Sequence, residues 1–262
     1  IMLFVNDFKD LEKPSSNSNL IYFGPGLHTK NNNGNINSSG EVVLTSGKTV
    51  FIDDGAYVRA RFVCNNASNV KIYGPGYIDG SAFARTVSPN EVHVPIEFNW
   101  CSNVSVEDVA ILDPAGWCFN MYFDNQVVID NVKIISSRHN GDGISLQTCQ
   151  NVKVTNSFVR SWDDSLVVKN YPNWSNRSHE GTTKNIVFDN IMVWTDLAQS
   201  MDVGYECVGQ VMEDIHFRNI TVMNNYQLAV FSIHNGNNAD IKDVTFENVT
   251  VEKAQLGTKD GH

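Results

Sequence analysis

Apolar and polar residues alternate in short runs along most of the chain, and the runs recur as copies of one phrase. Each copy begins with a polar residue, continues as an alternating run of Val, Ile or Phe, passes a central Asn or Asp, and ends with a second alternating run. A period of two residues indicates a β-strand, and a central Asn or Asp suits a bend between two strands. The copies begin at Asn103, Gln126, Asn151, Asn185, Asp214 and Asp243, after a weaker copy at Asn69.

The spacing of the copies predicts how these strands stack. Successive copies start 23, 25, 34, 29 and 29 residues apart, which is within the range of solenoid repeats. A third apolar segment follows each copy, and these segments are Cys118–Phe123, Gly143–Gln147, Ser165–Lys169, Met201–Glu206 and Ala229–His234. Three short strands per copy predict an all-β parallel β-helix, in which the same strand of consecutive coils stacks at about 4.8 Å.

Composition and charge narrow the classes of protein. The 262 residues are 42% hydrophobic and 18% charged, which is typical of one elongated domain over residues 1–262. We expect this domain to be an excerpt of a longer chain, because its last repeat would otherwise leave strand edges and core open. The net charge of −10 argues against nucleic acid or anionic membranes as partners, and no apolar run reaches membrane-spanning length. The five cysteines lack metal-site spacing, and we expect no metal or cofactor. We also expect a secreted, extracellular or periplasmic protein that is a monomer.

Three aspartates occupy matching positions in two consecutive copies. Asp142 lies directly before a third strand, and Asp163 and Asp164 lie directly before the next one, 21 and 22 residues later. Stacking of the coils would bring the three carboxyls together, and their pKa values would separate into those of an acid and a base. Cleavage of a glycosidic bond needs such a pair, so the sequence predicts a catalytic site at these residues.

Motifs around these aspartates resemble the polygalacturonase family of glycoside hydrolases, family 28. Asn140-Gly-Asp142-Gly-Ile is similar to that family's Asn-Thr-Asp-Gly motif, Trp162-Asp163-Asp164-Ser-Leu to its Asp-Asp motif, and Ile72–Gly80 to its Gly-rich turn. The chain also resembles the dextranase and isopullulanase family of glycoside hydrolases, family 49. The resemblance extends from about residue 20 onward and implies a right-handed parallel β-helix and an inverting mechanism. It further implies Asp163 as general acid, with Asp142 and Asp164 as the base that activates water.

Departures from the polygalacturonase pattern bear on the substrate. Where that family has Gly-His-Gly, the segment Leu197–Asp202 has no His, and where it has Arg-Ile-Lys, the segment Phe231–His234 has neither Arg nor Lys. Those cations suit the carboxylate of a uronic acid. We therefore expect a neutral polysaccharide, such as an α-glucan of the dextran or pullulan type, with hydrolysis of pectin as the alternative.

Further polar and aromatic side chains share the coil position of the aspartates and are candidates for binding sugar. They are Asn120, Tyr122, Gln147, Trp162, Lys169, Asp202, Tyr205, Glu206 and His234. Trp174 lies in a polar insertion that we expect to form a loop at the rim of the cleft, whereas Trp100, Trp117 and Trp194 adjoin apolar runs and are expected in the core.

Two other classes of function remain open. A polysaccharide lyase would hold Ca²⁺ with its carboxylates and use Lys169 as the base, and its unsaturated products would absorb in the ultraviolet. A non-catalytic carbohydrate-binding solenoid would carry the same aspartates but release no reducing ends from any polysaccharide.

Overall fold

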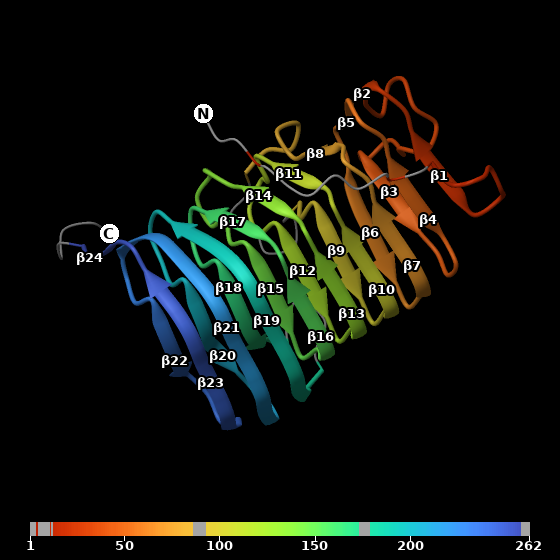
Figure 1. The fold of residues 1–262 in the computed structure, drawn as a ribbon. Coiled ribbons are helices and arrows are strands. Elements are labelled where there is room, and N and C mark those ends of the chain that lie inside the picture. The colour runs from red at the N-terminus through yellow and green to blue at the C-terminus, as the bar shows by residue number, and fades with distance from the viewer. Residues whose placement is uncertain (1–3, 5–10, 12, 86–92, 173–178, 258–262) are drawn as a thin grey trace.

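The computed structural model describes residues 4, 11, 13–85, 93–172 and 179–257. Over these ranges the regular structure consists of strands, which wind into a right-handed parallel β-helix, as predicted. The coils stack from the red N-terminal end to the blue C-terminal end in Figure 1 and make an elongated molecule. The described part of the chain has no helix of the length and apolarity needed to cross a membrane.

The first six coils each contain three strands. They are β1 (Leu20–Phe23), β2 (Gly26–His28) and β3 (Glu41–Leu44); β4 (Thr49–Ile52), β5 (Ala56–Val58) and β6 (Arg61–Asn65); β7 (Ser68–Tyr73), β8 (Tyr77–Asp79) and β9 (Ile96–Asn99); β10 (Ser102–Glu107), β11 (Ala110–Leu112) and β12 (Phe119–Tyr122); β13 (Asn125–Asp130), β14 (Lys133–Ile135) and β15 (Ile144–Gln147); and β16 (Gln150–Thr155), β17 (Phe158–Ser161) and β18 (Leu166–Asn170). The later strands are β19 (Gly181–Thr195), β20 (Met201–Cys207), β21 (Gly209–Gln227), β22 (Phe231–Asn235), β23 (Asp240–Val251) and β24 (Ala254–Leu256).

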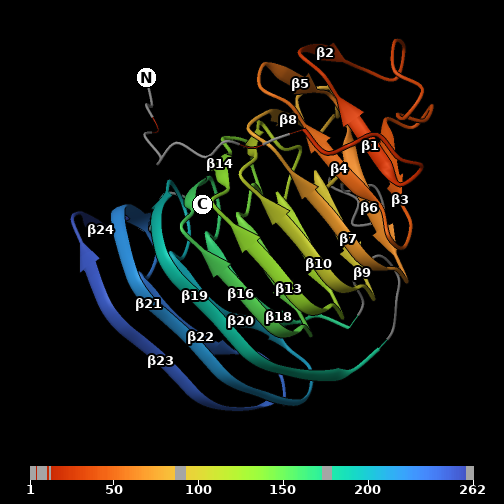
Figure 2. The same cartoon turned by 45° about the vertical axis from the view of Figure 1, so that its right-hand side comes forward.

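The strands form two parallel sheets. The third strands make an eight-stranded sheet in the order β22-β20-β18-β15-β12-β9-β6-β3. The first and second strands belong to one sixteen-stranded sheet, because the long strand β19 pairs with both β16 and β17. The predicted three short strands per coil are therefore present in the coils up to β18. In β19, β21 and β23 the first two strands are continuous, and Figure 2 shows these long strands curving around the C-terminal half.

Asparagines make the bends between strands and connect one coil to the next. Asn156 has a left-handed backbone angle of φ 52°, and the corresponding bend residues Asn131, Asn190, Asn219 and Asn248 have the same conformation. The Asn156 Nδ2 donates a hydrogen bond of 2.7 Å to Asp130 Oδ1, and Asn190 Nδ2 donates one of 2.8 Å to Asn156 Oδ1. Asn tolerates this backbone region better than most residues, so both its backbone and its side chain favour the bend.

Replacement of Asn156 tests whether this ladder, the row of hydrogen-bonded bend residues on adjacent coils, stabilises the fold. We expect Asn156→Ala to lower the free energy of unfolding by about 1–3 kcal/mol, because two hydrogen bonds and a residue suited to positive φ are lost together. Asn156→Gly keeps the backbone conformation accessible and should cost less. Urea unfolding followed by circular dichroism measures both variants. Equal stability of the Ala variant and the unmodified protein would contradict a stabilising ladder.

The core runs along the interior of the coils and is made of inward-facing aliphatic and aromatic side chains. Phe217 stacks between Phe188 and Phe246, with ring centres 4.9 and 5.1 Å apart. The tryptophans at positions 100, 117 and 194, expected in the core, are half-buried instead. Arg160 lies over the ring of Trp194, and Lys169 lies over the ring of Trp117. Trp174 is outside the described residues.

Candidate active site

Adjacent coils bring the three predicted aspartates together at the start of β15 and β18. The N–H of Gly143, the residue after Asp142, donates a hydrogen bond of 2.8 Å to the carbonyl oxygen of Asp164. A Cβ atom on Gly143 would lie 2.4 Å from the Ser165 carbonyl oxygen, so only glycine permits this close approach of the two coils. The stacking inferred from the spacing of 21 and 22 residues is therefore what the backbone shows.

The three carboxyl groups have different surroundings. Asp142 is 2% exposed, and no described residue donates a hydrogen bond to its Oδ1. Asp163 is half-buried, and its Oδ1 accepts the Asp164 N–H at 3.0 Å. Asp164 Oδ1 accepts the N–H of Gln199 at 2.9 Å, from the coil beyond. Backbone contacts thus orient the two consecutive carboxyls, while the first one is enclosed.

Burial raises the pKa of two of these carboxyls. It raises the pKa of Asp142 well above the usual range, and the neighbouring Asp163 carboxylate raises this pKa further. Burial also raises the pKa of Asp164 to about 7, although the positive charge of Lys169 opposes the shift. Raised pKa values on two neighbouring carboxyls are typical of sites of general acid and base catalysis.

Lys169 is the buried cation of this cluster. Its Nζ lies 3.4 Å from Glu206 Oε2 and 5.0 Å from the centre of the Trp117 ring. Burial opposes its charge, but the carboxylates of Asp142, Glu206 and other neighbours outweigh burial and raise the pKa of Lys169. A lysine held in its protonated form is poorly suited to act as the general base of a lyase.

Three of the sugar-binding candidates have no exposed surface at all. Asn120, Tyr122 and Gln147 project from the outer side of the eight-stranded sheet, but all are fully buried. Gln147 Nε2 donates to Asn120 Oδ1, and the Tyr122 hydroxyl donates to the Pro172 carbonyl oxygen at 2.9 Å. None of the three therefore presents an exposed surface to a sugar in this structure.

The candidates on β20 and β22 range from buried to exposed. Asp202 is 3% exposed and accepts a hydrogen bond from Ser232, and burial raises its pKa. Tyr205 is 52% exposed, with its ring 4.7 Å from that of His234 at an angle of 81°. Trp162, Lys169, Asp202 and Glu206 are half-buried or buried around the aspartates, whereas Tyr205 and His234 face solvent.

Several contacts at the site were not anticipated from the sequence. Trp117 lies against Lys169, Gln199 orients Asp164, and Ser232 holds Asp202. Arg85 Nη2 donates a hydrogen bond of 2.6 Å to Asn140 Oδ1 in the turn that carries Asp142. Each contact joins different coils or loops, so spacing within one repeat could not indicate it.

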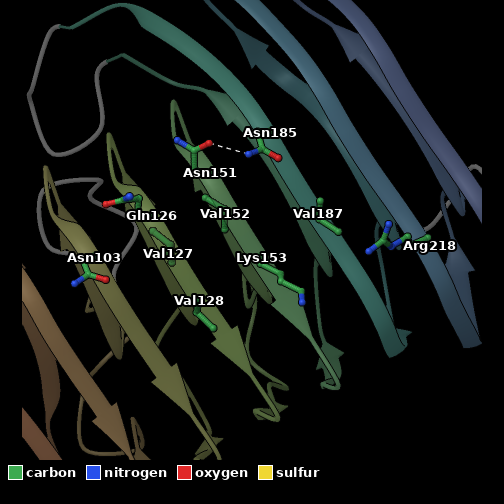
Figure 3. Close-up of a pocket in the computed structure, with 10 residues that line it drawn as sticks. All are labelled: Asn103, Gln126, Val127, Val128, Asn151, Val152, Lys153, Asn185, Val187 and Arg218. Atoms are coloured by element: carbon green, nitrogen blue, oxygen red, sulfur yellow. Dashed lines mark hydrogen bonds between the residues drawn. The ribbon is translucent and has the colours of Figure 1, made fainter.

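A groove of about 420 Å³ lies elsewhere, on the outer side of β10, β13, β16, β19 and β21. Figure 3 shows amide side chains along one side of it and Val128, Lys153 and Val187 on its floor. The Asn185 Nδ2 donates to Asn151 Oδ1 at 2.7 Å, so these amides serve the ladder between coils. The groove is a consequence of the stacked bends and contains none of the catalytic candidates.

Comparison with known proteins links this arrangement to one family. Residues 24–193, more than half of the chain, match the model of the glycosyl hydrolases family 28. A polygalacturonase of Brassica napus is 28% identical over 116 residues, which cover 40% of this chain and 29% of the relative. The chain thus spans less than a third of that relative's length.

Two solved structures share the fold. The polygalacturonase from Erwinia carotovora superposes with a TM-score of 0.56 at 15% identity, over 91% of this chain and 85% of that one. The exopolygalacturonase from Thermotoga maritima superposes with a TM-score of 0.66 at 17% identity, over 91% of this chain and 69% of that one. The similarity of these structures extends over nearly all of the β-helix.

Proposed function

The chain belongs to the glycosyl hydrolases family 28, and from this premise we propose that it hydrolyses glycosidic bonds of a pectic polysaccharide. The observation that carries the proposal is the convergence of Asp142, Asp163 and Asp164 from adjacent coils at one site. Relatives described as polygalacturonases favour a pectic substrate over the α-glucan expected from the missing Arg and Lys. A secreted or periplasmic monomer remains part of the proposal.

In the proposed mechanism, Asp163 protonates the leaving glycosidic oxygen while the other two carboxyls activate water on the opposite face of the sugar. This is the division of work between two carboxyls in an inverting hydrolase. The half-buried position of Asp163 supports the role of donor to a bound substrate. The Gln199 N–H on Asp164 Oδ1 supports its role as a base, because it holds one oxygen and leaves the second for water.

The dependence of the rate on pH tests the role of Asp164. A base works in its ionised form, and the pKa of Asp164 is raised to about 7, so kcat/KM should rise as pH increases through about 7. Asp164→Asn should lower the rate and remove this limb of the profile. Asp240→Asn, at an exposed carboxyl on β23, should leave the limb in place. An unchanged limb in the Asp164 variant would assign the ionisation to another group.

The function itself is tested by release of reducing ends from polygalacturonate, pectin, dextran and pullulan, with absorbance recorded in the ultraviolet. We expect new reducing ends from a pectic polymer without unsaturated products. Cleavage of dextran or pullulan alone would contradict the pectic substrate, and unsaturated products would identify a lyase. A lack of cleavage of all four polymers would favour a binding module.

A further inference from the structure

The candidate active site carries more negative than positive groups. Its carboxyls are those of Asp142, Asp163, Asp164, Asp202 and Glu206. Lys169 faces this group, but its Nζ already lies 3.4 Å from Glu206 Oε2 and stacks on the Trp117 ring. Its charge is therefore engaged within the protein before any substrate binds.

The side chains around β20 offer hydrogen-bond acceptors. Asp202 Oδ1, on β20, is buried, and no described residue donates a hydrogen bond to it. Buried acceptors of this kind are satisfied by hydroxyl or N–H donors. A carboxylate of the ligand placed beside Asp202 would instead bring like charges together in a site that already carries several carboxyls, which is unfavourable for binding.

An exposed aromatic surface lies on the same strand as Asp202, three residues further along the chain. Tyr205 is exposed on β20, and its ring meets that of His234 edge to face. Tyrosine presents an apolar face with a polar tip, which suits the ring and hydroxyls of a sugar. The combination of an aromatic face and negatively charged acceptors favours a ligand that is rich in hydroxyl groups and has no negative charge.

We propose that the sugar unit bound over β20, beside Asp202 and Glu206, carries no free carboxylate. Its chemical class is an uncharged pyranose, either a methyl-esterified uronate or a neutral sugar. A hydroxyl of this unit donates to Asp202 Oδ1, and Tyr205 packs against its ring. The proposal rests on the proposed function and specifies which form of pectic polymer the site accepts.

The test compares kcat/KM for methyl-esterified pectin, the same pectin after removal of its esters, and a neutral galactan. We expect at least about tenfold faster cleavage of an uncharged polymer than of the de-esterified one, because like charges oppose binding of the latter. If esterified pectin is cleaved fastest, the unit bound over β20 is a methyl-esterified uronate. If galactan is cleaved fastest, this unit is a neutral sugar. Either result supports an uncharged unit over β20.

Removal of the two charges provides a second readout. The double variant Asp202→Asn/Glu206→Gln keeps hydrogen-bonding groups and should reduce the preference for the uncharged polymer by at least about threefold. Glu213→Gln is the matched control, because Glu213 pairs with Lys184 and Lys242 on the other sheet and should leave the preference unchanged. Calorimetric binding of uncharged and de-esterified oligomers to Asp163→Asn measures the same preference without turnover.

Two results would overturn the proposal in distinguishable ways. Cleavage of the de-esterified polymer at a rate equal to or above that of both uncharged polymers overturns the uncharged unit and leaves pectic hydrolysis standing. A lack of cleavage of all three polymers overturns the proposed function and this inference with it. A preference that the double variant leaves unchanged overturns the role of Asp202 and Glu206.

Discussion

Asp163→Asn should reduce kcat by roughly 10²- to 10⁴-fold, the usual contribution of a general acid. The amide cannot donate the proton that the leaving oxygen needs, yet its oxygen can still accept the Asp164 N–H as the carboxylate does at 3.0 Å. The side chain is half-buried, so the substitution should leave the circular dichroism spectrum and thermal midpoint nearly unchanged. Release of reducing ends at saturating substrate measures the effect.

The matched control for this variant is Asp240→Asn, which removes an exposed carboxyl far along the chain from the aspartate cluster. It should retain the activity of the unmodified protein. If Asp163→Asn is also fully active, proton donation belongs to another carboxyl, and Asp142 would be examined next because burial raises its pKa well above the usual range.

Phe217→Ala should lower the free energy of unfolding by about 3–5 kcal/mol, the usual cost of removing a buried phenyl ring. Phe217 is fully buried, and its ring stacks between Phe188 and Phe246 on adjacent coils. Its loss would leave a cavity that two coils share. Urea unfolding compares this variant with Leu256→Ala, which removes a side chain that is 82% exposed and should change stability by less than about 0.5 kcal/mol.

An equal effect of the two substitutions would show that the stacked rings contribute nothing beyond surface packing. A large loss in the Phe217 variant alone would support a continuous core as the main source of stability in the coils. Intact secondary structure at low denaturant is needed for the comparison, since a fully unfolded variant gives only a lower limit for the loss.

The repeats account for the part of the fold that the sequence predicted well. Alternation and a central Asn or Asp are local properties, and a residue such as Asn156 adopts its bend wherever two strands meet. Asp142 and Asp164 occupy equivalent positions in adjacent coils for the same reason, because parallel strands of consecutive coils stack in register. The family's motifs lie within these same coils.

Other features depend on contacts that no single repeat contains. The continuity of β19 reflects pairing with two neighbouring strands, which the local pattern around Asn190 does not reveal. Alternation places Asn120 and Gln147 on the outer side of the sheet, but only tertiary packing shows that they are buried there. Likewise, the stacking of Lys169 on Trp117 joins two coils, so its engaged charge became evident only in three dimensions.

The stereochemistry of cleavage tests the central claim most directly. Nuclear magnetic resonance spectra recorded during the first turnovers on a pectic oligomer show the anomeric configuration of the newly formed reducing end. Direct attack of water assisted by Asp142 and Asp164, with Asp163 as acid, predicts the configuration opposite to that of the cleaved bond. A first product with retained configuration would contradict this account, because it requires a covalent intermediate.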